Sequence, residues 1–327
     1  MTFIIMIVVV ALIFDFLNGF HDSANAIATV VSTRVLKPQW AVLWAAFFNF
    51  IAFLFFDLNV ANTIGVGLVD ASVVDPLVVF SALISAIFWN VFTWYYGIPS
   101  SSSHALIGGI IGAAIAKSSV DSVNVVGLSK ILVSIVASPL LGLFLGFVLM
   151  IGVARLFFYS SRQKSDNVFK KLQLISSAWI SLGHGANDAQ KTMGIIAVLL
   201  YSSHMIGPEF HIPFWVVISC NFTIALGTLF GGWRIIKTMG MQITKLKPVH
   251  GFCAETATAA ALFLATHLGI PVSTTHTITG AIVGVGSVQK VSAVRWGLAA
   301  RIVWAWVLTI PATLMLSAAL WTIIDYY

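Results

Sequence analysis

The sequence predicts an all-α membrane protein with about ten transmembrane or re-entrant helical segments, arranged as two inverted-topology repeats with broken helices. Of its 327 residues, 59% are hydrophobic and only 9% are charged, whereas a soluble domain carries about 25% charged residues. The apolar stretches approach the ~20 residues that span hydrocarbon and lack the alternation of a barrel strand. Helices then remain as the way to satisfy every backbone polar group in lipid. A set of motifs that occurs twice in the same order predicts the repeats.

Ten apolar segments can be traced along the chain. The first is interrupted at Asn18–Asp22 and the third at Gly97–Ser100, and the second half repeats both interruptions. The N-terminal segment lacks a basic region and a small-residue cleavage site, so we interpret it as a mature first helix. The segments lie at residues 3–17, 40–56, 76–96, 104–116, 129–158, 172–182, 212–231, 252–268, 274–287 and 294–324.

The two halves of the chain match each other across a polar stretch. We place the first inverted repeat at residues 1–159, a short cytoplasmic linker at 160–171 and the second inverted repeat at 172–327. Matching pieces include Asp22 with Asp188, Pro139 with Pro311, Thr63-Ile64-Gly65 with Thr238-Met239-Gly240, and Pro99-Ser100-Ser101-Ser102-Ser103-His104 with Pro271-Val272-Ser273-Thr274-Thr275-His276. Their common order indicates an internal duplication.

The charges of the loops predict how the chain crosses the membrane. If the first segment crosses once, nearly all basic loops fall on one side and the acidic loop residues on the other. The positive-inside rule then places the basic side in the cytoplasm and both termini outside, and it makes the second half inverted. Whether segments 76–116 and 252–287 cross or re-enter stays open, because the charge pattern is the same either way. Inverted repeats with broken helices are typical of secondary transporters, whose substrate site lies near the midplane.

Two hydroxyl triplets form the first candidate site. Ser101, Ser102 and Ser103, and likewise Ser273, Thr274 and Thr275, follow a proline and open an apolar helix. They could serve only as helix N-caps. Two helix N-termini facing each other would instead offer unpaired N–H donors, positive dipoles and hydroxyls to a small tetrahedral oxyanion, and the symmetry favours that interpretation.

Acidic residues inside two apolar segments form the second candidate site. Asp22 lies near Asn25, and Asp188 lies near Gln190 and Lys191. A carboxylate within an apolar segment is costly and usually functional, although a cap or an interhelical contact is the alternative. The carboxylates could hold Na⁺ or take a proton. Lys191 could replace one bound cation or pair with the anion.

Other features are weaker. His21, His184, His104 and His276 flank these motifs, and Glu255 either anchors an interface or joins an ion path. The net charge of +6 is explained by membrane orientation rather than by nucleic acid. Cys220 and Cys253 show no metal spacing and no disulfide framework. The symmetric Ser and His residues provide no distinct nucleophile and base, so we expect no enzyme.

At these motifs the sequence resembles the inorganic phosphate transporter (PiT) family, over essentially the whole chain. The motifs are Gly19-Phe20-His21-Asp22-Ser23-Ala24-Asn25-Ala26, Gly97-Ile98-Pro99-Ser100-Ser101-Ser102-Ser103-His104, His184-Gly185-Ala186-Asn187-Asp188-Ala189-Gln190-Lys191 and Gly269-Ile270-Pro271-Val272-Ser273-Thr274-Thr275-His276. The resemblance implies phosphate symport with Na⁺ or H⁺, without a cofactor, by a homodimer with a moving transport domain. Sodium-coupled members have Asn where this chain has Lys191. The Gln190-Lys191 form resembles the bacterial low-affinity, proton-coupled branch, which carries phosphate partly as a divalent metal–phosphate complex.

We therefore expect a symporter in the plasma (inner) membrane that imports inorganic phosphate, free or as a metal–phosphate complex, with H⁺ or Na⁺. Sulfate transport on the same fold and an anion channel are the alternatives. No metal ligands are assigned. The expected phosphate-binding residues are Ser101, Ser102, Ser103, Ser273, Thr274, Thr275, Gln190 and Lys191, and the expected coupling-cation residues are Asp22, Asn25, Asp188 and Asn187.

Overall fold

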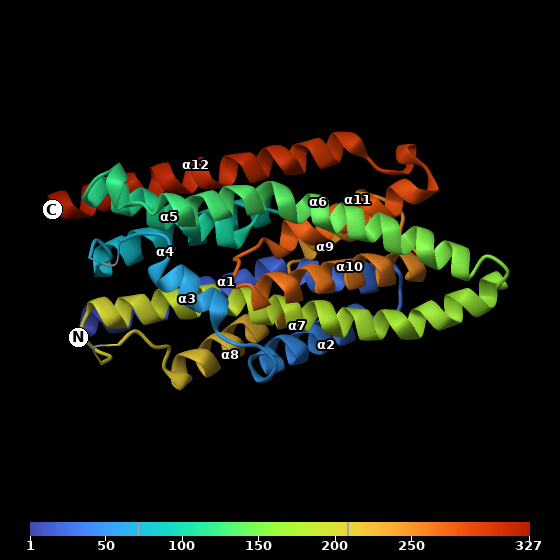
Figure 1. Ribbon diagram of the computed structural model, residues 1–327, viewed down its shortest axis with the longest axis horizontal. Helices are drawn as coiled ribbons and strands as arrows, with labels where there is room; N and C mark the ends of the chain where they lie inside the picture. The colour runs from blue at the N-terminus through green and yellow to red at the C-terminus, as the bar shows by residue number, and fades with distance from the viewer. Residues whose placement is uncertain (71, 208) are drawn as a thin grey trace.

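The computed structural model describes residues 1–70, 72–207 and 209–327, and these ranges are built almost entirely of helices (Figure 1). The first half contains α1 (Thr2–Ser32), α2 (Pro38–Ile51), η1 (Ala52–Leu54), α3 (Asn59–Val66), α4 (Pro76–Tyr95), α5 (Ser102–Lys117), η2 (Val120–Ser122) and α6 (Val125–Leu156). The second half contains α7 (Arg162–Ser202), α8 (Phe214–Phe230), α9 (Trp233–Lys237), the π-helical turn η3 (Thr238–Gln242), α10 (Pro248–His267), α11 (Thr274–Gln289), η4 (Val291–Ala293) and α12 (Trp296–Tyr326). The predicted all-α class is confirmed.

The two halves have the same order of helices and opposite directions. Helix α1 lies antiparallel to its counterpart α7: Asp15 is bonded to Thr192 near one end of the pair, and Thr33 is bonded to Gln173 near the other. The packing is reciprocal, since α11 packs on α6 as α5 packs on α12, and α1 packs on α8 as α2 packs on α7. Both termini lie at the same end of the molecule (Figure 1). The predicted inverted repeat is therefore present.

Several helices are long and apolar enough to cross a membrane. Within the described residues, α1, α4, α6 and α12 meet this condition alone, and α8 meets it together with the segment Trp233–Gln242 across a bend of 62°. Helix α7 is long, but it carries the polar residues His184, Asp188 and Lys191 in its middle. Its low hydropathy follows from these residues and from the charged stretch Arg162–Lys171 at its start.

Helices α4 and α5 form a hairpin, and so do α10 and α11. At the open end of the first hairpin, Lys117 Nζ donates to Asp75 Oδ2 over 2.7 Å, which joins the end of α5 to the start of α4. At the open end of the second, the side chains of Gln289 and His250 lie 2.5 Å apart. Each hairpin therefore returns to the end of the molecule from which it starts.

The tips of the hairpins are held by the opposite half of the chain. Gly97 and Gly269 adopt φ values of 65° and 66°, a left-handed conformation that glycine adopts without steric cost. Thr238 Oγ1 donates to Gly97 O over 2.8 Å, and Thr63 Oγ1 donates to Gly269 O over 2.8 Å. The matching Thr-x-Gly motifs of the sequence are therefore matching clamps on the two tips.

The structure differs from the sequence prediction where breaks were expected at Asp22 and Asp188. Both residues lie within continuous helices, α1 and α7. The glycines beside them serve close packing instead, since a Cβ on Gly19 would lie 2.1 Å from Ile224 O and one on Gly185 would lie 2.4 Å from Asn49 O. Polar residues interrupted the apolar pattern without interrupting the backbone. Helix α7 begins at Arg162, so most of the stretch 160–171 is also helical.

Glycine contacts lead to a prediction about stability. A Cβ on Gly280 of α11 would lie 2.1 Å from Pro139 O of α6, whereas a Cβ on Gly152 of α6 would meet nothing within 4 Å. We expect Gly280→Ala to force the two helices apart and to destabilise the protein by about 1–3 kcal/mol. Thermal unfolding in detergent measures the effect, with Gly152→Ala as the matched control. Equal melting temperatures for the two variants would contradict the tight packing of α11 on α6.

Candidate functional site

Most of the predicted site residues are buried around one point in the middle of the molecule. The centres of α1 and α7 meet the N-termini of α5 and α11 there, and the rings of His104 and His276 at the two tips are 4.8 Å apart. Each of the twelve predicted residues is at most 3% exposed: Asp22, Asn25, Ser101, Ser102, Ser103, Asn187, Asp188, Gln190, Lys191, Ser273, Thr274 and Thr275. A polar cluster of this depth is closed to solvent on both sides.

Asp22 receives hydroxyl groups from both hairpin tips. Ser102 Oγ donates to its Oδ2 over 3.2 Å, and Thr275 Oγ1 donates to its Oδ1 over 3.3 Å. Asn25, one turn further along α1, donates to Thr275 Oγ1 over 3.0 Å. In addition, His21 Nδ1 lies 2.7 Å from Asp22 Oδ1. The carboxylate therefore links α1 to both halves of the protein.

Asp188 is the counterpart of Asp22, with an ammonium group added. Ser103 Oγ donates to its Oδ1 over 3.2 Å and Thr274 Oγ1 donates to its Oδ2 over 2.6 Å. Lys191 Nζ forms an ion pair with Asp188 and also donates to Ser103 Oγ over 2.5 Å and to Val272 O over 2.8 Å. Such an ammonium is stabilised only because several acceptors surround it.

The first hydroxyl of each triplet caps its helix and the other two face the carboxylates. Ser101 Oγ accepts from His104 N over 3.3 Å, and Ser273 Oγ accepts from His276 N over 3.2 Å. Both roles considered for the triplets are therefore present, but they belong to different residues. The tips place Ser102, Ser103, Thr274 and Thr275 between the two carboxylates.

A cation site is possible beside these hydroxyls. Ligand atoms of Asp22, His184 and Asp188 all lie within 4.8 Å of one another. His184 Nε2 lies 3.3 Å from Asp188 Oδ2, and its Nδ1 lies 3.3 Å from Asn49 Oδ1. Two carboxylates and an imidazole can hold a small cation. The sequence pattern indicated a weaker role for His184 than this, although its position four residues before Asp188 would place both side chains on one helix face.

Two predicted residues lie apart from this cluster. Gln190 Oε1 accepts from Val60 N over 3.0 Å and Ala61 N over 3.2 Å, so it caps α3, and its Nε2 donates to Asp57 O over 2.8 Å. Asn187 Nδ2 donates to Thr266 Oγ1 of α10 over 3.2 Å. Their neighbours in sequence point inward, but these two side chains leave α7 on other faces.

Glu255 connects three helices on one side of the cluster. Its carboxylate accepts from Thr29 Oγ1 of α1 over 2.5 Å, and from Gln173 Nε2 over 2.8 Å and Ser176 Oγ over 2.5 Å, both on α7. These hydrogen bonds hold α10 against α1 and α7. Glu255 therefore anchors a helix interface, which is one of the two roles considered for it from the sequence.

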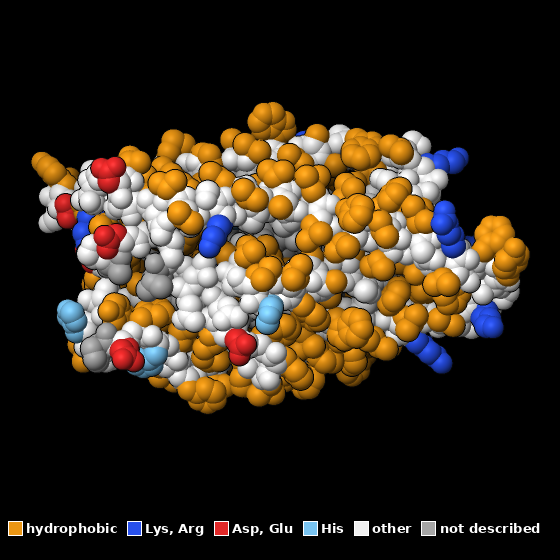
Figure 2. Space-filling model, in the orientation of Figure 1, with side chains coloured by type: hydrophobic (Ala, Val, Ile, Leu, Met, Phe, Trp, Pro, Cys, Tyr) orange, Lys and Arg blue, Asp and Glu red, His pale blue; other side chains and the backbone are white. Residues whose placement is uncertain are grey.

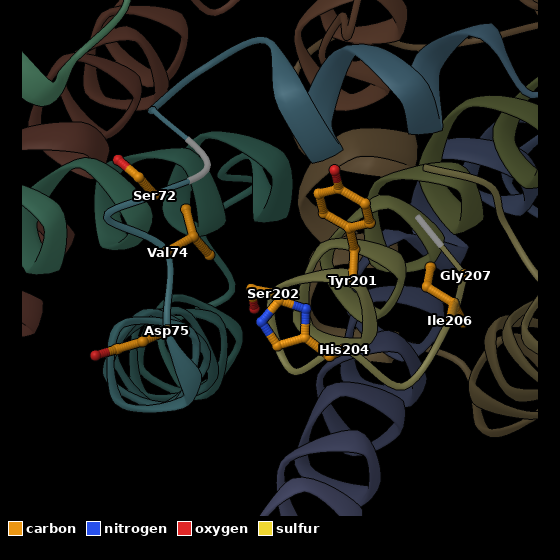
Figure 3. Close-up of a pocket in the computed structure, with 8 residues that line it drawn as sticks. All are labelled: Ser72, Val74, Asp75, Tyr201, Ser202, His204, Ile206 and Gly207. Atoms are coloured by element: carbon orange, nitrogen blue, oxygen red, sulfur yellow. The ribbon is translucent and has the colours of Figure 1, made fainter. Parts of the chain in front are cut away.

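A separate cavity of about 850 Å³ lies at the end of α7 that is near the termini (Figure 3). It is lined by Ser72, Val74, Asp75, Tyr201, Ser202, His204, Ile206 and Gly207. Beside it, Ser72 N and Oγ each donate to Asp70 Oδ1 over 2.9 Å, and these hydrogen bonds hold the pKa of the exposed Asp70 carboxyl below its ordinary value. No residue of the central cluster lines this cavity, so we treat the two as distinct.

Two inverted repeats whose hairpin tips enclose a buried polar cluster form the architecture of a secondary transporter. The chain belongs to the phosphate transporter family, because the model of that family matches residues 18–317. It is 62% identical over 312 residues to a probable low-affinity inorganic phosphate transporter of Rhizobium meliloti (strain 1021), covering 95% of this chain and 93% of that protein. A probable low-affinity inorganic phosphate transporter of Bacillus subtilis (strain 168) is 45% identical, with 98% and 97% covered. A solved sodium-dependent phosphate transporter matches with a TM-score of 0.91 and 27% identity over 100% of both chains.

Proposed function

We propose that the protein imports inorganic phosphate across the plasma membrane by symport with H⁺ or Na⁺. The observation that carries the proposal is the cluster of Ser102, Ser103, Thr274 and Thr275 between Asp22 and Asp188, with the ammonium of Lys191 among them. Hydroxyls at two helix N-termini can bind an oxyanion, and the carboxylates can bind the cation that accompanies it. The relatives named as inorganic phosphate transporters support phosphate as the substrate.

The buried charges support coupling to a cation. Asp15, Asp22, Asp188 and Glu255 are all at most 3% exposed, and Lys191 is the one buried Lys or Arg side chain among the described residues. An anionic substrate would add negative charge to a region that already has more carboxyls than ammonium groups. Protons or metal cations must therefore accompany phosphate if the loaded core is to remain stable in lipid.

The position of Lys191 favours protons over sodium. Asn25 bonds to Thr275 on one tip, and Lys191 bonds to Ser103 on the other, so the two residues occupy equivalent places. An amide oxygen at this place could bind Na⁺, whereas an ammonium group repels it. Because a solved relative is named a sodium-dependent phosphate transporter, the uptake experiment also includes a sodium gradient.

Phosphate also fits the cluster better than sulfate does. Sulfate is fully deprotonated near neutral pH, whereas phosphate can donate a proton to a neighbouring carboxylate. Asp22 and Asp188 both share hydroxyl partners with the proposed anion site. A divalent metal bound with phosphate would find its protein ligands among Asp22, His184 and Asp188.

The remaining parts of the proposal concern the membrane and the assembly. On the face drawn in Figure 2, most visible Lys and Arg side chains gather at the end opposite both termini. The positive-inside rule places that end in the cytoplasm and both termini outside. We also propose a homodimer within the lipid bilayer, and transport rather than catalysis as the activity.

Uptake of radiolabelled phosphate into proteoliposomes tests the function. We expect accumulation driven by an inward proton gradient without Na⁺, and no accumulation without a gradient. Accumulation only with Na⁺ would keep the symporter and change its coupling ion. Accumulation of sulfate in place of phosphate would contradict the substrate, and equilibration without concentration under every gradient would indicate an anion channel.

A further inference from the structure

Helix α1 presents a buried polar stripe along one face. Its members are Asp15, Asn18, Asp22, Asn25 and Thr29, and their spacing of three or four residues places them on the same side of the helix. Asp22 and Asn25 belong to the central cluster, and Thr29 donates to Glu255. Asp15 lies about two turns from Asp22 toward the end that carries the termini.

Asp15 is a carboxyl with one satisfied oxygen. It is 0% exposed, and its Oδ1 accepts from Thr192 Oγ1 of α7 over 2.8 Å. Its Oδ2 has no hydrogen-bond partner, and Asp15 takes part in no ion pair among the described residues. Lys191 lies next to Thr192 in sequence, but its Nζ is directed to Asp188, Ser103 and Val272.

Among the residues that the structure describes, no positively charged side chain pairs with Asp15. The titratable groups that face it are Asp188 on α7 and Cys220 on α8, with Asp22 further along its own helix. The neighbouring Ala11 and Phe14 belong to an apolar cluster that includes Cys220 and Met193. An ionised carboxylate with a single hydrogen bond is unstable in such a place, whereas a protonated carboxyl is not.

A proton bound at Asp15 would also provide a hydrogen-bond donor for an unpaired acceptor in the polar stripe. Asn18 Oδ1 is a second buried acceptor without a donor, and it lies three residues after Asp15 on the same face. A protonated Asp15 has an O–H group that can donate to such an acceptor. One bound proton therefore supplies the hydrogen-bond donor that is otherwise missing. We propose that Asp15 is a proton-binding site, located between the anion site and the end of the molecule that carries the termini, and that it carries a coupling proton. This proposal rests on the proposed symport of phosphate.

Linkage explains how this proton would be coupled to phosphate. Arrival of an anion beside Asp188 increases the negative potential at Asp15 and strengthens the binding of a proton there. By reciprocity, a protonated Asp15 strengthens the binding of phosphate by the same factor. Release of phosphate on the other side then releases the proton, and the gradient of either drives the other.

The test compares proton and phosphate movements in proteoliposomes with a pH-sensitive dye inside. We expect Asp15→Asn to bind phosphate and to take up about one proton fewer per phosphate than the wild type. The slope of log affinity for phosphate against pH should also fall by about one, because each linked proton contributes a tenfold change per pH unit. Asp15→Glu should keep the wild-type stoichiometry, and Asp121→Asn, a change at an exposed acid, serves as the control.

A second variant keeps the proposal testable if Asp15→Asn fails to fold. Thr192→Val removes the hydroxyl that donates to the carboxylate while leaving the carboxyl in place. The ionised form then loses a stabilising hydrogen bond, so the proton should bind more tightly and the pH dependence of phosphate affinity should move to higher pH.

The outcomes separate this inference from the proposed function. If the wild type accumulates phosphate with protons and the Asp15→Asn and Thr192→Val variants retain its stoichiometry and pH dependence, Asp15 has only a structural role. If uptake by the wild type depends on Na⁺ and Asp15→Asn alters that dependence, the residue binds Na⁺ and the proton site is wrong. If the wild type accumulates no phosphate under any gradient, the proposed function itself fails.

Discussion

Asp22→Asn is expected to abolish gradient-driven phosphate uptake while leaving the protein folded. The carboxylate accepts hydroxyls from both hairpin tips, Ser102 and Thr275, and an amide of the same shape keeps room for both contacts. The amide cannot take a proton and lacks the charge that holds a metal cation. Removal of a residue that only hydrogen-bonds to a metal ligand weakens metal binding by about 10–100-fold. Loss of the ligand Asp22 itself should weaken cation binding by at least that factor.

Initial rates of uptake in proteoliposomes measure this effect under proton and sodium gradients. Asp121→Asn, which neutralises an exposed acid away from the cluster, serves as the matched control and should transport normally. Thermal unfolding of the purified variant shows whether it is folded. Normal gradient-driven uptake by folded Asp22→Asn would remove Asp22 from the coupling site and would leave the cation assignment without its main support.

Lys191→Met should both destabilise the protein and stop transport. It leaves Asp188 buried without its ammonium partner, and removal of one member of a buried ion pair costs about 3–5 kcal/mol. It also removes the positive charge that we expect to face the anion. The melting temperature and the affinity for phosphate should therefore fall together.

The double variant Lys191→Met/Asp188→Asn separates the two effects. Removing both charges should recover most of the lost stability, because no unpaired ion remains in the core. Transport should stay absent, since the ammonium group is still missing. Lys290→Met, at an exposed position, serves as the control for the loss of a positive charge. Phosphate uptake by the double variant would show that Lys191 is needed for folding and not for the substrate.

The sequence predicted most of the fold, because the duplication left its motifs in order. The hydroxyl triplets stand at the N-termini of α5 and α11, and the two aspartates face them from α1 and α7. Residues repeated at symmetric positions constrained one another, so the fold and the central pairings could be predicted together.

The remaining features depend on information that a linear pattern does not contain. The helix around Asp22 is continuous because its polar residues find partners on other helices, which no local rule reveals. Gln190 caps α3 because of the direction in which its side chain leaves α7, although its neighbours Asp188 and Lys191 point inward. His184 and Asp15 have no equivalent residue of the same kind in the other half, so symmetry gave no signal for them.

The reciprocal contacts of the tips have a consequence for the history of the protein. Asp22 in the first half needs Thr275 from the second, and Asp188 in the second needs Ser103 from the first. Neither half alone encloses the cluster. A progenitor that encoded a single half would have assembled it only by pairing two copies inserted in opposite directions in the same membrane. Fusion of two such genes would then allow the positions of Asn25 and Lys191 to differ, which two identical copies inserted in opposite directions could not do.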